Sequence, residues 1–396
     1  MFSKSVSDNL KRASGIRAMF EEGEKLKKAF GAENVFDFTL GNPDPEPPAE
    51  IKRTLLSLLN SGQSGLHRYM ANAGFLDIRE KIAEQISIES GIEMPVSNVV
   101  MTCGAAGGLN VVLKSILNPG EEVLSFAPCF PEYAFYTDNH GGIFKMVPFD
   151  GGSFQPKPEA LRALINPLTK AIILNSPNNP TGAVYKAANL FGIKKVIEEK
   201  QNEYGTTIYV ISDEPYTRLV YDGVKVPDIF LIFDNSIKVN SYSKSLSLPG
   251  ERIGYVAVNP LIKDCGALMD AIIFCNRVLG YVNAPALFQR VIAKNLNVCV
   301  DCGIYKEKRD MLYDGIIAAG FECEKPDGAF YLFPKSPIAD DVEFKNIALE
   351  HKLLVVPGKS FGAPGYLRLS YCVSMDTIIN SLPVFAKLGL QLRSVK

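Results

Sequence analysis

The sequence predicts an α/β fold, in which a large domain is built on a mostly parallel sheet between helices and is accompanied by a smaller α+β domain. Two observations carry this prediction. Short apolar runs alternate with helical patterns through the middle of the chain, which is typical of parallel strands buried on both faces. Past about residue 285, helices and short strands follow in mixed order, which indicates a separate α+β unit.

The pattern of apolar residues places the individual elements. The N-terminal part predicts an amphipathic helix over residues 8–30. Strands are then expected over 98–103, 122–126, 171–175, 208–213 and 237–241, with a helix over 105–117. The C-terminal part predicts a long helix over 285–319, a strand over 328–333, a helix over 342–351, and strands over 353–357 and 366–371.

The length of the chain bounds the number of domains. At roughly 150 residues per domain, 396 residues are enough for about two to three domains, and a hydrophobic fraction of 47% supports large cores. We expect the large domain to span residues 46–285. The small domain is expected to combine residues 1–45 with residues 286–396.

The charge balance argues against several classes of partner. A formal net charge of -1 provides no general attraction to nucleic acid or to anionic lipid. No apolar run of about 18 residues predicts a transmembrane helix, and the polar N-terminus lacks the apolar core of a secretory signal. We therefore expect small-molecule substrates and neither a nucleic-acid nor a membrane partner.

The eight cysteines are scattered along the chain, which is typical of reduced thiols in a cytoplasmic protein. Cys299 and Cys302 form one C-x-x-C pair, but no second pair is spaced to complete a zinc site. We expect two thiols packed within the long helix rather than a metal or redox centre. The three histidines show no metal-ligand spacing, so no metal site is predicted.

The strongest chemical signal is the segment from Asn240 to Tyr255, which reads N-S-Y-S-K-S-L-S-L-P-G-E-R-I-G-Y. One lysine, Lys244, lies there among small hydroxyl residues, just after an apolar run. A lysine that is enclosed and close to a fixed arginine loses its proton more easily and attacks an aldehyde. An enzyme that holds pyridoxal phosphate as a Schiff base needs such a lysine, although so short a pattern can also arise by chance.

The ends of predicted strands supply further candidates, because ligands in open α/β sheets bind beyond the carboxyl ends of the strands. Asp213 is either a turn residue or the partner of a pyridinium nitrogen, which a carboxylate keeps protonated. Tyr216 either packs in the core or donates to the ring hydroxyl of the cofactor. Asn179, in the turn N-S-P-N-N-P-T-G, either stabilises a loop or contacts the phenolic oxygen or a substrate carboxylate.

A second group of residues is suited to a phosphate. The segment from Thr102 to Gly108 joins a strand to a helix, and its small residues either pack closely or let backbone N–H groups approach an anion. The Ser241 hydroxyl and the Arg252 guanidinium would complete such a site. Phe130 follows another strand end, where it either packs in the core or stacks on a flat ring.

Arg368 is the one cation in the apolar stretch L-R-L-S. Arginine is rarely buried unless it is paired, and no acidic residue lies nearby in the sequence. Two interpretations follow: Arg368 pairs with a carboxylate from elsewhere in the fold, or it binds the α-carboxylate of a substrate in a bidentate manner.

Together these segments resemble the class I and II aminotransferases, which are pyridoxal phosphate enzymes of fold type I. The resemblance extends from about residue 38 to residue 370. Its motifs occur in the family's order: N-x-P-D after Gly41, Tyr69 followed by G-x-x-x-[IL]-R, N-P-T-G, D-E-P-Y, S-x-S-K with G-x-R-x-G-Y, P-x-G-A-F-Y and V-P-G-x-x-F-G. As a set they are highly specific. The resemblance implies pyridoxal 5'-phosphate as cofactor and a sheet of the seven-stranded type.

The resemblance also implies a role for each residue at the cofactor ring. Lys244 would hold the cofactor as an internal aldimine and would then move a proton between Cα and C4′ as general base. Asp213 would pair with the ring nitrogen, and Tyr216 and Asn179 with the ring oxygen. Phe130 would stack on the ring.

The remaining implied roles concern the phosphate and the substrate. Arg368 would bind the α-carboxylate, assisted by the backbone of Gly41 and by Asn179. Tyr69 would reach the phosphate of a neighbouring subunit, which implies a homodimer with shared active sites. The residues that would hold the phosphate within one subunit are Gly104, Ala105, Ala106, Ser241 and Arg252.

The reaction that the resemblance implies is a ping-pong transamination. An L-amino acid would leave pyridoxamine phosphate and a 2-oxo acid, and a second 2-oxo acid, expected to be 2-oxoglutarate, would reverse the sequence. Aspartate aminotransferases of this branch often carry a lysine in the phosphate segment, but residues 104–108 contain none, so aspartate is not expected to be the preferred donor. Tyr281, Asn283 and Arg277 are candidates for the side-chain region.

Two alternatives to an aminotransferase belong to other functional classes. A C–S β-lyase of the cystathionine β-lyase type shares the fold and most of these residues, and needs no oxo-acid acceptor. A non-enzymatic effector sensor would add a DNA-binding domain before residue 38 and a basic face, neither of which is expected here.

Overall fold

The computed structural model describes residues 2–393, except for the side chains of residues 11–18, 20 and 391–393. Its centre is a seven-stranded sheet in the order β2-β8-β7-β6-β5-β3-β4. β8 is antiparallel to its neighbours β2 and β7, and all other neighbours pair in parallel, which confirms the predicted mostly parallel sheet. The strands are β2 (Val99–Thr102), β3 (Glu122–Phe126), β4 (Ile143–Val147), β5 (Thr169–Asn175), β6 (Tyr209–Asp213), β7 (Ser236–Ser241) and β8 (Gly254–Val258).

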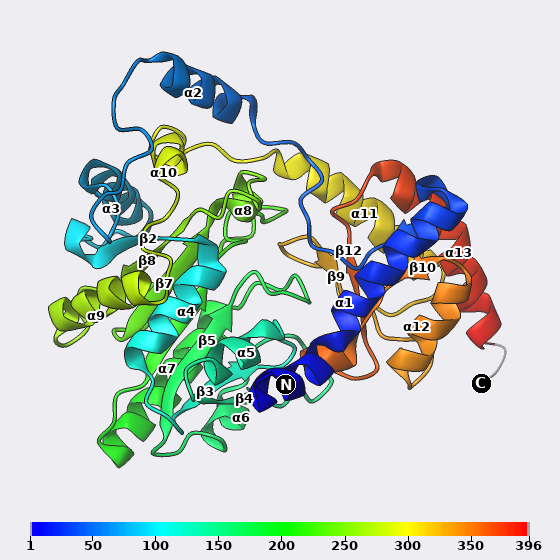
Figure 1. Ribbon diagram of the computed structural model, residues 1–396. Coiled ribbons are helices and arrows are strands. Elements are labelled where there is room, and N and C mark those ends of the chain that lie inside the picture. The colour runs from blue at the N-terminus through cyan, green and yellow to red at the C-terminus, as the bar shows by residue number, and fades with distance from the viewer. Residues whose placement is uncertain (1, 394–396) are drawn as a thin grey trace.

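Helices cover both faces of this sheet (Figure 1). On one face, α4 (Gly104–Ile116) and α9 (Cys265–Val278) share a core with strand residues that include Ile173. On the other face, α3 (Leu76–Ser90) and α7 (Ala187–Tyr204) share a core with Ile172. Successive strand residues point to opposite faces, so the continuous apolar runs of the sequence are explained by burial on both sides.

The C-terminal elements gather around a second core, beside the sheet (Figure 1). α11 (Cys302–Ala318), α12 (Asp341–Glu350) and α13 (Met375–Arg393) surround short strands. β11 (Val356–Pro357), β12 (Leu367–Ser370) and β9 (Tyr331–Leu332) form one antiparallel sheet, and β1 (Phe36–Asp37) pairs in parallel with β10 (Leu353–Leu354). This is the smaller α+β unit that the sequence predicts.

The remaining helices connect or flank these two cores. They are α1 (Lys4–Phe30), α2 (Ala49–Asn60), α5 (Glu132–Asp138), α6 (Pro158–Arg162), α8 (Tyr242–Ser245) and α10 (Ala286–Ala293). α1 runs from the C-terminal unit toward α5 in Figure 1, where Asn9 Nδ2 donates to Asp138 Oδ2 at 2.7 Å. Within the described residues, no helix is both long and apolar enough to cross a membrane.

The predicted long helix over 285–319 is wrong, because the chain forms two helices, α10 and α11, with an irregular segment between them. The side chain of Asn295 turns back to donate to the carbonyl of Val291, and Asp301 caps α11 by accepting from the backbone N–H of Gly303. Asparagine and aspartate compete for backbone hydrogen bonds in this way, so they favour helix ends.

Smaller differences concern the strands and the first helix. The sequence did not predict β4 or β8, and the strand expected over 328–333 is limited to Tyr331–Leu332. The strand expected over 353–357 is divided between two sheets, since β10 pairs with β1 and β11 pairs with β12. The first helix begins at Lys4, four residues before the expected start at residue 8.

Candidate active site

A cavity of about 320 Å³ lies at the carboxyl ends of the parallel strands. Asn175 and Asp213 end β5 and β6 and are paired in register, and Ser241 ends β7. The structure therefore brings the strand-end candidates to one edge of the sheet, as the fold class requires. Of the predicted site residues, the cavity wall contains Gly41, Ala105, Ala106, Phe130, Asn179, Asp213, Tyr216, Ser241, Lys244, Arg252 and Arg368.

Lys244 lies in α8, the short helix that follows β7, and its amine faces the cavity. Nζ donates a hydrogen bond to the carbonyl oxygen of Gly41 at 2.6 Å and lies 5.4 Å from the centre of the Phe330 ring. Burial lowers the pKa of Lys244 to about 8, and the charges of Arg252 and Arg368 act in the same direction. At neutral pH, a far larger fraction of such an amine is unprotonated, and so able to act as a nucleophile and as a base, than of an ordinary lysine.

Asp213 has one carboxylate oxygen bonded and one free. Oδ2 accepts a hydrogen bond from the Tyr133 hydroxyl at 2.7 Å, whereas Oδ1 is buried without a hydrogen-bond partner. Burial raises the pKa of Asp213 to about 7, and the hydrogen bond from Tyr133 opposes that rise. A buried, unpaired carboxylate oxygen is costly, and a protonated ring nitrogen would supply the missing donor, so this residue fits the pyridinium end of pyridoxal phosphate.

Replacing Asp213 with asparagine is expected to stabilise the cofactor-free protein at alkaline pH. The folded pKa of about 7 lies above the unfolded value of about 3.9, so the folded protein alone holds this proton between those values. The free energy of unfolding therefore falls as pH rises through this window, and it stays low above pH 7.

Urea unfolding of the cofactor-free proteins at pH 5 and pH 8 measures this effect. We expect the advantage of Asp213→Asn over the natural protein to grow by about 2 kcal/mol between these pH values. The difference at pH 5 is the internal control for packing effects. An advantage of equal size at both pH values would show that Asp213 ionises without cost.

The phosphate end of the cavity is formed by the start of α4 and by the turn that contains Arg252. Ala105 and Ala106 line the cavity in the first turn of α4, where backbone N–H groups lack helical partners. Gly104 has φ +69°, and a Cβ atom there would lie 2.9 Å from Nη2 of Arg252. Ser241 Oγ accepts from the backbone N–H of Ser243 at 3.2 Å, which holds it at the same end. Small residues, a helix N-terminus and a guanidinium together fit a phosphate group.

Gly104→Ala is expected to weaken the binding of pyridoxamine phosphate at least about 10-fold, because the new methyl group displaces the Arg252 guanidinium. The matched control is Gly205→Ala, since Gly205 has a similar φ of +64° but open space around the position of a Cβ. Both variants pay a similar backbone cost of about 1 kcal/mol. Titration of the two cofactor-free variants with pyridoxamine phosphate should therefore give a higher dissociation constant for Gly104→Ala than for Gly205→Ala. Equal dissociation constants would contradict this placement of the phosphate.

Arg368 is buried in β12 and points toward Asn179. Nη1 donates to Asn179 Oδ1 at 3.2 Å, Nη2 donates to the carbonyl of Thr39 at 2.5 Å, and Nε has no hydrogen-bond partner. Among the ion pairs between described residues, none involves Arg368. A buried guanidinium without a carboxylate partner fits the second of the two interpretations, the binding of a substrate carboxylate.

Tyr216 and Phe130 also face the cavity. The Tyr216 hydroxyl forms a hydrogen bond of 2.9 Å with that of Tyr331, and burial raises the pKa of Tyr216 well above its usual value. Phe130 contacts the ring of Tyr133 edge-on, with 5.6 Å between ring centres. Tyr216 is therefore a neutral hydrogen-bond donor, as a partner for the ring oxygen of the cofactor has to be.

Several residues of the site were not among those predicted. They are Leu40, Leu109, Glu132, Tyr136, Asn175, Pro215, Ser243, Pro249 and Tyr331 in the cavity wall, and Tyr133 behind Asp213. The position of Asn175 at the end of a predicted strand was a usable signal. Glu132 and Tyr133 follow the strand end that supplied Phe130, but nothing in the sequence distinguishes Tyr136 or Tyr331 from core tyrosines.

Other predicted residues lie outside this cavity wall. Tyr69 is 88% exposed, and Gly104 is adjacent to the site through Arg252. Tyr281, Asn283 and Arg277 are also absent from the wall as the described chain forms it. Asn283 instead contacts the segment after Tyr69, since its Nδ2 donates to the carbonyl of Ala71 at 3.0 Å.

The Cys299 and Cys302 pair does not lie within one helix, which corrects the expectation of two helix-packed thiols. Cys302 is the first residue of α11, and Cys299 lies before this helix. The Sγ atom of Cys302 lies 3.2 Å from the carbonyl oxygen of Arg218, and that of Cys299 lies 4.0 Å from the same oxygen. Among the described residues, no group of three or more histidine, cysteine, aspartate or glutamate side chains could hold a metal ion.

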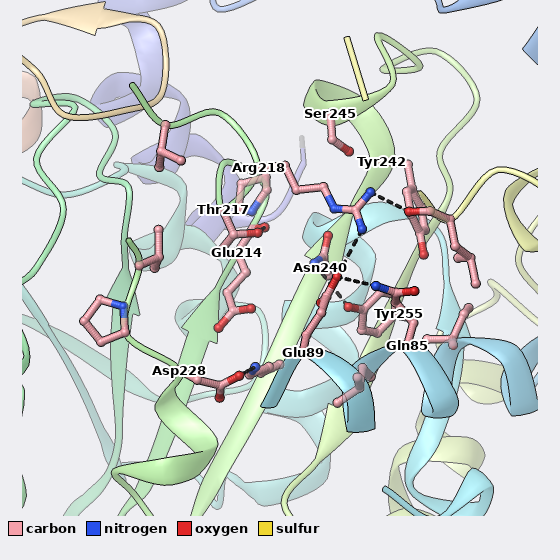
Figure 2. A pocket seen from close by; sticks show the side chains of 18 of the residues that line it. Gln85, Glu89, Glu214, Thr217, Arg218, Asp228, Asn240, Tyr242, Ser245 and Tyr255 are labelled. Carbon is pink, nitrogen blue, oxygen red and sulfur yellow. Dashed lines mark hydrogen bonds and ion pairs between the residues drawn. The ribbon is translucent and has the colours of Figure 1, made fainter. Parts of the chain in front are cut away.

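A second cavity, of about 420 Å³, is lined by β7 and α3 residues and contains none of the predicted site residues (Figure 2). Four of its charged side chains form two ion pairs: Lys238 Nζ lies 2.7 Å from Asp228, and Arg218 lies 3.1 Å from Glu89. Glu214, next to Asp213 in the chain, faces this cavity, and burial raises its pKa. We therefore place the chemistry in the first cavity, where Lys244 and Arg368 lack carboxylate partners.

Comparison with known proteins agrees with this geometry. Residues 33–382 match the family model of aminotransferase class I and II. The aspartate/prephenate aminotransferase of Thermus thermophilus is 32% identical over 357 residues, which cover 88% of this chain and 89% of that protein. This relative is named an aminotransferase, and the alternative of a C–S lyase is not supported.

Solved structures give the same result. The crystal structure of an aminotransferase from Eubacterium rectale matches with a TM-score of 0.95 and 40% identity over 99% of both chains. That of the aspartate aminotransferase from Thermus thermophilus with maleate matches with a TM-score of 0.84 and 28% identity, over 94% of this chain and 96% of that one. This chain belongs to the class I and II aminotransferases, a family of transaminases that depend on pyridoxal phosphate.

Proposed function

We propose that Lys244, Asp213 and Arg368 form the working centre of this aminotransferase, with Lys244 as the residue that binds the cofactor. One observation carries the proposal: a lysine with a pKa of about 8, a carboxylate with a free buried oxygen and an unpaired arginine all face one cavity of about 320 Å³. These are the nucleophile, the ring partner and the carboxylate receptor that a transamination requires.

In this proposal, different residues of the chain bind the substrate and transfer its proton. When bound, pyridoxal phosphate supplies an electron sink for the charge that develops at the substrate Cα. Arg368, with Asn179 and the Gly41 backbone, holds the α-carboxylate and so fixes the orientation of Cα. Lys244 Nζ would take the proton from Cα and would return it at C4′ of the cofactor.

Further residues hold the cofactor in position. Tyr133 donates a hydrogen bond to Asp213, whose carboxylate would keep the ring nitrogen protonated. Tyr216 and Asn179 would donate to the ring oxygen, and Phe130 would pack against the ring. The phosphate would be enclosed by Gly104, Ala105, Ala106, Ser241 and Arg252.

The substrates in this proposal are an L-amino acid and a 2-oxo acid, with 2-oxoglutarate as the expected acceptor. The named relative from Thermus thermophilus acts on aspartate or prephenate, according to its name. No lysine occurs between Gly104 and Gly108 to bind a second carboxylate, which supports a preferred donor other than aspartate.

The protein is proposed to act as a homodimer in which Tyr69 reaches the phosphate site of the neighbouring subunit. Tyr69 is 88% exposed in the single chain, and Arg252 is exposed although it faces the cavity. A large exposed aromatic side chain and an exposed guanidinium at a phosphate site are both accounted for if a second subunit covers them.

The compartment and the domain limits are also proposals. All eight cysteines lie among the described residues and are free thiols, which supports the cytoplasm. We propose a large domain over residues 46–285 and a small domain formed by 1–45 and 286–396. α10 packs on α3, and its Val291 is buried in the core that α3 shares with the sheet, so the contacts place the crossing to the small domain after α10, a few residues later than 285.

Product analysis tests the proposed reaction. The holoenzyme is incubated with single L-amino acids, with and without 2-oxoglutarate. We expect equal amounts of L-glutamate and of the new 2-oxo acid, and sustained turnover only when the acceptor is present. Pyruvate and ammonia released from cystathionine without an acceptor would instead identify a lyase.

A further inference from the structure

Glu132 is an acidic side chain in the active-site wall that the proposed mechanism does not use. It is the first residue of α5, directly after the segment that carries Phe130, and it lines the same cavity as Lys244 and Arg368. Its Oε2 atom is buried and has no hydrogen-bond partner. A buried carboxylate oxygen without a donor is costly, so a donor from a ligand would be favoured there.

The surroundings of Glu132 place it on the substrate side of the cavity. Arg368 attracts its charge, but no hydrogen bond or ion pair joins these two described residues. The negative charge of Glu132 also acts on Tyr136 and Tyr331, since it contributes to the rise in the pKa of both tyrosines. Glu132 and Arg368 line one cavity, so a substrate whose α-carboxylate is held by Arg368 would lie within reach of Glu132.

The space beside Glu132 favours hydrogen-bond donors over negatively charged groups. Burial raises the pKa of Glu132, which shows that its negative charge is poorly solvated. A second carboxylate on the substrate would face this charge, and residues 104–108 contain no lysine to offset it. The described cations of the wall are Lys244, Arg252 and Arg368, which the proposed function assigns to the cofactor and to the α-carboxylate. An amide, hydroxyl or ammonium group would instead donate to the free oxygen.

We propose that Glu132 is a specificity-determining residue that favours amino acids with a hydrogen-bond donor on the side chain and disfavours aspartate and glutamate as donors. The inference rests on the proposed function, because it takes Arg368 as the anchor of the α-carboxylate. 2-Oxoglutarate carries the same second carboxylate as glutamate, so its binding as acceptor requires Glu132 to take up a proton from solvent.

The test uses L-glutamine and L-glutamate, which are nearly isosteric and differ in the group that would meet Glu132. Single-turnover rates of the holoenzyme with each amino acid in excess give kcat/KM even for slow substrates. For Glu132→Gln, we expect the ratio of glutamine to glutamate to fall at least about 10-fold, because the amide donates to a carboxylate without taking up a proton. The control is Glu84→Gln, which removes an exposed carboxylate from α3.

The possible outcomes are distinct. A ratio that is the same in Glu132→Gln and in the natural protein would overturn the inference, as would the absence of reaction with both amino acids in both proteins. If the natural protein still converts another donor such as L-alanine, the proposed function stands and only the role of Glu132 fails. If no amino acid reacts at all, the proposed function itself fails.

Discussion

Lys244→Ala is expected to reduce kcat by a factor on the order of 10⁴ to 10⁶, because it removes both the covalent attachment of the cofactor and the base that moves the Cα proton. The fold should persist, since the Lys244 amine makes one hydrogen bond, to Gly41, and alanine is tolerated in a helix. Single-turnover kinetics with added pyridoxal phosphate measure the loss.

Two further variants control this prediction. Lys244→Arg keeps the positive charge but cannot form an imine, so it should lose as much activity as the alanine variant. Lys263→Ala removes an exposed lysine and should leave kcat unchanged. Near-natural kcat in Lys244→Arg would show that the charge, and not the nucleophile, is what the reaction needs.

Arg368→Leu is expected to reduce kcat/KM by a factor on the order of 10² to 10³. The substitution keeps an apolar side chain in β12 but removes the guanidinium that would hold the α-carboxylate, and such buried charged contacts are worth about 2–5 kcal/mol. Steady-state kinetics with the preferred amino acid measure the effect.

A substrate analogue without a carboxylate provides the control for Arg368→Leu. A simple alkylamine has no group for the guanidinium to bind, so the natural protein and Arg368→Leu should convert it at similar, low rates. If Arg368→Leu lowered the rates with the amino acid and with the amine by the same factor, the site would be damaged in general. That result would contradict the role of Arg368 as carboxylate receptor.

The sequence predicted the parts of the site that follow from strand periodicity. Asp213 and Ser241 end strands that are apolar on both faces, so the sheet itself brings them together at one edge. Arg368 was detectable because a cation stands out in an apolar strand. The motif G-x-R-x-G-Y marked Arg252, whose left-handed φ of 52° turns its side chain toward Gly104.

The sequence did not predict contacts that depend on tertiary packing. Tyr133 bonds Asp213 across 80 positions, and Tyr331 comes from the second core, so no local pattern connects them with the site. Glu132 lies in a segment already identified, yet its free oxygen depends on which neighbours surround it. The break between α10 and α11 was missed because the apolar pattern continues through residues 294–301 although Asn295 and Asp301 end and cap the helices.

The absorbance spectrum of the purified protein, before and after addition of single L-amino acids, tests the central claim most directly. We expect a band near ~420 nm that shifts toward ~330 nm with a reactive amino acid, as a lysine-bound cofactor accepts the amino group. The amino acids that cause the shift would name the donor. No band at all, even after pyridoxal phosphate is added, would contradict the assignment of Lys244 and its cavity as an aminotransferase site.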